Sequence, residues 1–184
     1  RFVEAQAPVF HTVVAELAMG HKETHWMWFI FPQLKDLGKS AMAKRYGIES
    51  ADEAKAYLAH PLLGSRLVEC AQLLLAQRNA NAFEIFGSPD ELKLRSCMTL
   101  FAVVAPEQPV FRQVLDARRR TLGSDHPDTL GTIEALADAL QKSGDLRGAE
   151  ALLATPLDAL ACGPGLGTSP EAKRLLEQAC TLNL

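Results

Sequence analysis

The most unusual chemistry in the chain lies in a short stretch that holds His25, Trp26, Trp28 and Gln33. Two tryptophans two residues apart are costly to expose to water, because each carries a large apolar ring system. They could wall an aromatic pocket for a flat ligand, with His25 and Gln33 supplying hydrogen bonds at its ends. Alternatively, both are core residues whose indole N–H groups bond to backbone carbonyls. We favour the core and keep the pocket as a hypothesis.

His25 is the candidate for a catalytic residue, because histidine can act as a general acid or base near neutral pH. It needs an orienting partner, and Glu23 is the acidic side chain nearby in the sequence. His21 and His25 stand four residues apart, a spacing that allows joint metal binding on a helix. No third ligand is spaced to complete such a site. We therefore expect no metal and no other cofactor.

Lys93, Arg95 and Ser96 form a second group of polar side chains. Cationic side chains bind phosphate and carboxylate groups through charge-assisted hydrogen bonds, so this group could hold an anionic ligand. In the alternative, Lys93 is solvated, Arg95 pairs with a surface acid and Ser96 has no role. An enzyme would need His25, Lys93 and Arg95 in one cleft.

The elements that carry these residues are expected to be helices. Apolar residues at helical spacing predict a helix over residues 8–20 that ends at Gly20. Residues 26–31 are apolar throughout, which fits either a buried strand or a buried helical turn. Ser50 and the glutamate three residues later form a capping-box pattern, and the helix they open should end by about residue 59.

Three more helices are predicted over residues 64–79, 89–105 and 109–122. The clearest start is at Ser88, which we expect to cap the second of them, with Pro89 in its first turn and Glu91 at the capping-box position. Cys97 falls on the apolar face of that helix. It is therefore expected to be an inert core residue and not a nucleophile.

The remainder of the chain has a different character. Two short amphipathic helices, over residues 129–143 and 146–153, predict a helical hairpin. A stretch rich in glycine and proline follows, and it predicts a flexible linker before a last helix that begins at Pro170. The predicted fold is therefore all-α, with a small helical domain over residues 1–115, a hairpin over 116–155 and a linker with a C-terminal helix over 156–184.

Composition narrows the classes of function. The chain has 19 lysines and arginines against 22 acidic residues, a formal net charge of −3, which makes nucleic acid an unexpected partner. No C-x-x-C pair or signal peptide is present, and the longest apolar run is far too short to span a bilayer. We expect a cytoplasmic protein that does not contact a membrane. Because it begins at Arg1 and not at methionine, we expect an excerpt or a trimmed product.

Five ordered blocks carry a family resemblance: RFVEAQAPVF at 1–10, HWMWFIFPQL at 25–34, GKSAMAKRYGI at 38–48, EAKAYLAHPLLG at 53–64 and IFGSPDELKLRSCMTLF at 85–101. Through them, residues 1–115 resemble the bacterial domain of unknown function 1810, sometimes mislabelled calpastatin-like. The resemblance implies a small helical domain and brings no activity with it. Arg45, Tyr46 and His60 lie in these blocks and become further candidates for ligand binding.

Residues 118–153 resemble one tetratricopeptide repeat of the kinesin-light-chain type. The resemblance rests on Leu122-Gly123, on HPDTL at 126–130, on Leu136-Ala137, on GDL at 144–146 and on Ala149-Glu150. Such repeats bury their apolar faces on neighbours and work by presenting a helical surface to other proteins. The resemblance therefore implies a protein partner for the hairpin.

Together these patterns predict a ligand-binding or protein-interaction module. Its expected partners are a small anionic ligand at the first domain and a protein at the hairpin. The alternative is a small hydrolase or transferase for a nucleotide-like or phosphorylated substrate, with His25 as general base and Lys93 or Arg95 as the anion clamp.

Overall fold

The computed structural model describes residues 1–77 and 80–122, and this part of the chain is mainly helical. One isolated parallel bridge joins Leu34 to Ile48. The prediction of an all-α fold is confirmed. The helices are α1 (Phe2–Gln6), α2 (Phe10–Met19), α3 (Met27–Ile30), the 3-10 helix η1 (Lys35–Leu37), α4 (Ala41–Arg45), α5 (Ala51–Ala59), α6 (Leu63–Ala76), α7 (Ala82–Phe86), α8 (Asp90–Val104) and α9 (Val110–Leu122).

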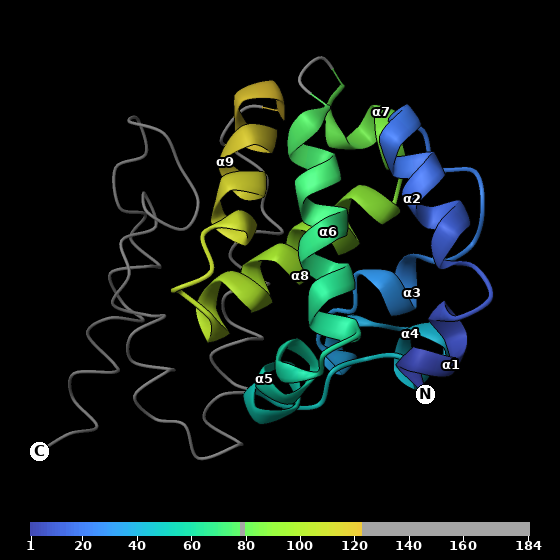
Figure 1. Cartoon of the computed structure of the whole chain (residues 1–184), viewed down its shortest axis with the longest axis vertical. Helices are drawn as coiled ribbons and strands as arrows, with labels where there is room; N and C mark the ends of the chain where they lie inside the picture. The colour runs from blue at the N-terminus through green and yellow to red at the C-terminus, as the bar shows by residue number, and fades with distance from the viewer. Residues whose placement is uncertain (78–79, 123–184) are drawn as a thin grey trace, which may run out of the picture.

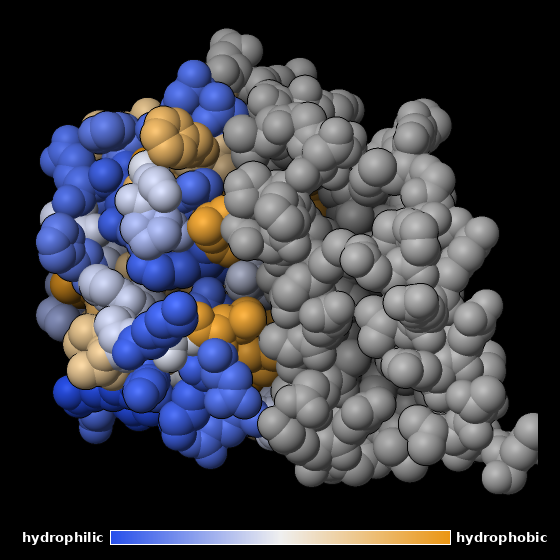
Figure 2. Space-filling model, turned by 180° about the vertical axis from the view of Figure 1, so that it is seen from behind, coloured by the Kyte–Doolittle hydropathy of each residue, from blue (hydrophilic) through white to orange (hydrophobic). Residues whose placement is uncertain are grey.

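Helix α6 stands between α9 and α2 and packs against both (Figure 1). Helix α8 contacts α9, α7, α5 and α3, so it joins elements from both halves of the described chain. No helix among the described residues is long and apolar enough to cross a membrane. The surface seen in Figure 2 is mostly hydrophilic where it is described, with smaller hydrophobic areas between the polar side chains.

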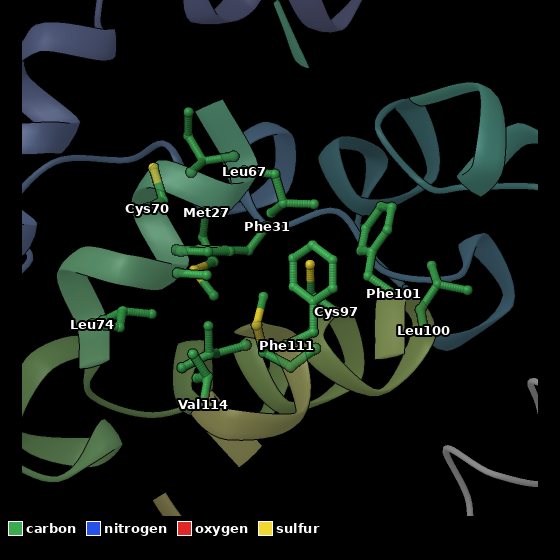
Figure 3. Close-up of a cluster of buried hydrophobic side chains, with 14 of the residues drawn as sticks. Met27, Phe31, Leu67, Cys70, Leu74, Cys97, Leu100, Phe101, Phe111 and Val114 are labelled. Carbon is green, nitrogen blue, oxygen red and sulfur yellow. The ribbon is translucent and has the colours of Figure 1, made fainter. Parts of the chain in front are cut away.

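The core gathers where α3, α6, α8 and α9 meet (Figure 3). Phe101 and Phe111 are fully buried there, with ring centroids 5.6 Å apart. Cys70 and Cys97 are also fully buried as free thiols. Burial raises the pKa of Cys70 to about 12 and raises the pKa of Cys97 well above its ordinary value. Cys97 is therefore an unreactive core residue, as predicted.

Local signals correctly located several helix ends. Helix α2 ends at Gly20, which adopts the left-handed conformation with φ 70° that glycine tolerates best. Helix α5 begins after Ser50, whose hydroxyl accepts a hydrogen bond from Glu53 N at 3.1 Å. Residues 26–31 contain the helical turn α3 and no strand. One start was misplaced, since α2 begins at Phe10 and not at Pro8.

The predicted cap at Ser88 is wrong. Helix α8 begins at Asp90, and no side chain caps it. The carbonyl oxygen of Gly87 takes that role, because it accepts hydrogen bonds from Asp90 N at 3.0 Å and Glu91 N at 3.1 Å. The complete capping box lies instead at Asn81 with Glu84, which opens α7.

Helix α9 confirms the helix predicted over residues 109–122 and continues through the predicted domain boundary at residues 115–116. The predicted hairpin, the Gly/Pro linker and the last helix lie outside the described residues. The division of the chain at residues 115 and 155 therefore stays a prediction.

We expect that Gly64→Ala lowers the free energy of unfolding by about 1–3 kcal/mol, because a Cβ atom at this position would overlap with the carbonyl oxygen of Leu58. Urea unfolding at neutral pH measures the change. Gln72→Ala, at an exposed position of the same helix, serves as the control. Equal stability of the two variants would contradict the close packing of α5 on α6.

Candidate functional site: a lysine–aspartate cluster beside Trp28

The buried carboxylate of Glu16 organises the loop between α2 and α3. Its side chain is 3% exposed, and it accepts hydrogen bonds from Glu23 N at 3.0 Å, from Thr24 Oγ1 at 2.7 Å and from Trp26 Nε1 at 2.7 Å. Burial alone would raise the pKa of Glu16, but these hydrogen bonds outweigh it and lower the pKa. The carboxylate is therefore ionised at neutral pH.

Trp26 is a core residue. Its ring is 1% exposed and packs edge-on against Phe86, with centroids 6.2 Å apart. The indole N–H donates to the Glu16 carboxylate. The core interpretation had predicted a backbone carbonyl as its partner. Trp26 therefore has no N–H left to offer a ligand.

Trp28 has a different environment. It is partly buried on α3, and the ammonium group of Lys93 lies 5.0 Å from the centre of its ring. A cation at this distance is attracted by the electron density of the ring face. The structure thus brings together one residue from each of the two candidate groups, although they are far apart in the sequence.

Asp90 joins Lys93 to Lys22, which lies in the loop between α2 and α3. Its Oδ1 lies 2.6 Å from Lys93 Nζ and its Oδ2 lies 2.8 Å from Lys22 Nζ, and these side chains are 16%, 18% and 9% exposed respectively. Burial would raise the pKa of Asp90, but the hydrogen bonds from Lys22 and Lys93 lower it further than burial raises it. We call Lys22, Asp90, Lys93 and Trp28 the lysine–aspartate cluster. It contains two cations and one anion.

Sequence reasoning missed Glu16, Lys22 and Asp90. A signal existed for Asp90, because an aspartate in the first helical turn with a lysine three residues later is a common side-chain pair. Lys22 carried no such signal, since its partner lies far away in the sequence. Glu16 carried no signal either, because glutamates are ordinarily exposed.

The remaining candidates have the following environments. His25 is exposed and hydrogen-bonds to no described residue. Gln33 makes a backbone contact with another segment, because its carbonyl oxygen accepts a hydrogen bond from Ile48 N at 2.9 Å. Arg45 is exposed, with its guanidinium 5.4 Å from the ring of Tyr46, which is 7% exposed. Arg95 and Ser96 are partly buried on α8.

His60 has a structural role at the start of α6. Its backbone is extended, with φ −68° and ψ 125°, and its carbonyl oxygen accepts from Gly64 N at 2.9 Å. Its Nδ1 accepts from Leu62 N at 3.2 Å and from Leu63 N at 3.4 Å. His60 thus satisfies two backbone N–H groups at the turn that leads into α6, much as a capping side chain does. Helix α6 itself begins at Leu63, one residue before the predicted start at residue 64.

Within the described part of the chain, no three His, Cys, Asp or Glu side chains are placed to hold a metal ion. The His21 and His25 pair therefore gains no described third ligand. The charged side chains of the cluster, those of Lys22, Asp90 and Lys93, pair with one another instead.

Comparisons with known proteins bear on the same region. A family model described as a protein of unknown function (DUF1810) matches residues 1–133, which include the whole cluster. The conserved hypothetical protein Rv1873 from Mycobacterium tuberculosis, solved by crystallography, is 52% identical. The match covers 66% of this chain and 91% of that one, with a TM-score of 0.63. No curated protein matches the chain.

We expect that Glu16→Gln lowers the free energy of unfolding at pH 7 by about 2 kcal/mol, because hydrogen bonds to a charged acceptor are lost. The folded-state pKa of Glu16 is depressed, so its stabilisation is present above its ordinary value of 4.5 and is lost as the pH falls through the lower folded value. The difference between wild type and variant should therefore shrink below about pH 4.5.

Urea unfolding at pH 7 and in acid measures this effect. Glu4→Gln, which makes the same change at an exposed glutamate of α1, is the control. A difference between wild type and Glu16→Gln that stays constant with pH would contradict a stabilising Glu16 carboxylate.

We expect that His60→Ala destabilises the protein by about 1 kcal/mol, because two backbone N–H groups lose their acceptor. His60→Asn should retain most of the stability, since asparagine is among the best N-cap residues. Thermal unfolding of both variants measures this, with His21→Ala as an exposed-histidine control. Equal losses for alanine and asparagine would rule out a capping role.

Proposed function

Because the chain belongs to the DUF1810 family, whose description assigns no function, we propose a function from the site itself: the helical domain binds a small anionic ligand at the lysine–aspartate cluster. The observation that carries this proposal is the imbalance of charge. One carboxylate, that of Asp90, serves two ammonium groups, so the cluster keeps one positive charge that no member neutralises. An anion is the partner that such a site attracts.

The hydrogen-bonding capacity of the cluster supports the same conclusion. Each lysine ammonium has three N–H donors, and Asp90 uses one from each. The remaining donors are the groups that would bond to the oxygens of a phosphate or carboxylate. Since both ammonium groups are partly buried, their attraction for an anion is screened less than at an open surface.

The pair formed by Lys35 and Glu49 makes a useful contrast. It also joins a lysine to a carboxylate, at 2.5 Å, but its side chains are 43% and 61% exposed. The pair is balanced, with one charge of each sign, and exposed pairs of this kind contribute little. We therefore assign it no ligand.

The alternative of a small hydrolase or transferase would use His25 as the general base. It stays a prediction, since His25 has no described partner that would orient its imidazole. A protein partner for residues 118–153 is a second proposal, supported by the resemblance to a tetratricopeptide repeat. A cytoplasmic location is likewise a proposal from the sequence.

We expect Lys93→Met to weaken the binding of inorganic phosphate by at least about tenfold, because the variant leaves Lys22 and Asp90 as a balanced pair. Isothermal titration calorimetry at low ionic strength measures the affinity, and added salt should weaken it. Lys35→Met removes the same charge from the contrasting pair and should leave binding unchanged. Absence of phosphate binding in the wild type, or equal losses in both variants, would refute the proposal.

A further inference from the structure

We infer that the anion bound at the lysine–aspartate cluster carries a flat aromatic ring, which stacks on the indole of Trp28. This inference rests on the proposed function and adds the class of ligand. It combines two features that the sequence places far apart and the fold brings together: an aromatic face on α3 and a cationic group on α8.

Trp28 is suited to contact a ligand in a way that Trp26 is not. Trp26 is fully buried and its N–H is bonded to Glu16, whereas Trp28 is partly exposed and its N–H donates to no described group. Its neighbours Met27 and Phe29 are buried, which anchors α3 on both sides of it. Trp28 is thus a partly exposed ring on a firmly held turn.

Lys93 links the ring to the charge. Its ammonium lies 5.0 Å from the ring centre of Trp28 while it is bonded to Asp90 at 2.6 Å. An anion that binds Lys93 draws the ammonium toward itself and away from the ring face. An aromatic group on the same ligand then replaces the cation on that face, because offset stacking of two rings is favourable.

The distances limit the shape of the ligand. A charge-assisted hydrogen bond places the anion about 2.8 Å from the Lys93 nitrogen, which itself lies 5.0 Å from the ring centre. The anionic group therefore binds within a few ångströms of the Trp28 ring. An aryl phosphate or an aromatic carboxylate, in which the anionic group is bonded directly to the ring, meets this condition.

The test compares phenyl phosphate with inorganic phosphate on the full chain, by calorimetry. We expect phenyl phosphate to bind the wild type about fivefold to tenfold more tightly than inorganic phosphate. Trp28→Leu should abolish this preference and Trp28→Phe should keep it. Phe83→Leu, which alters an aromatic residue that is 55% exposed elsewhere, should also keep it.

The outcomes separate the two proposals. Equal binding of phenyl phosphate and inorganic phosphate by the wild type would overturn the ring inference and leave the anion site standing. Failure of both to bind would overturn the anion site and the inference with it. A preference for phenyl phosphate that survives in Trp28→Leu would show that the ring lies elsewhere. The wild-type comparison decides even where a variant does not fold.

Discussion

The geometry of the candidate site depends on one buried carboxylate. Glu16 accepts hydrogen bonds from two backbone N–H groups, a hydroxyl and an indole in the segment that joins α2 to α3. Hydrogen bonds to a charged acceptor are roughly twice as strong as neutral ones, and a buried carboxylate without them would be strongly destabilising. Four donors therefore converge on it. These hydrogen bonds hold in place the segment that carries Lys22 and leads to Trp28.

A second set of contacts connects the same segment to α7 and α8. Lys22 N donates to the carbonyl oxygen of Ile85 at 2.8 Å, and the Lys22 ammonium reaches Asp90. For Asp90, the hydrogen bonds from Lys22 and Lys93 outweigh the effect of burial on its pKa, so these contacts favour the charged cluster. The two lysines bring one more positive charge than Asp90 neutralises, and the anion that we propose would bind to this excess charge.

The sequence predicted the features that depend on neighbours along the chain. The Gly20 end of α2 and the Ser50 cap of α5 follow from local backbone chemistry, and the helical periodicity identified the fold class. The Ser88 cap failed because the Gly87 carbonyl, which every residue type offers, already occupied the donors of α8. His60 was overlooked as a cap because imidazole rarely has that role. The lysine–aspartate cluster depends on two segments that are distant in the sequence, residues 22–28 and 90–93, which no local pattern relates.

The conformation of residues 26–31 decided what kind of site the chain could form. A strand would have placed Trp26 and Trp28 on the same face, since side chains two apart in a strand point the same way. In a helical turn each residue advances by about 100°, so two residues apart lie on nearly opposite sides. One tryptophan therefore meets Glu16 in the core and the other meets Lys93 near the surface. In place of a pocket walled by both rings, the structure has a single partly exposed ring beside a cation.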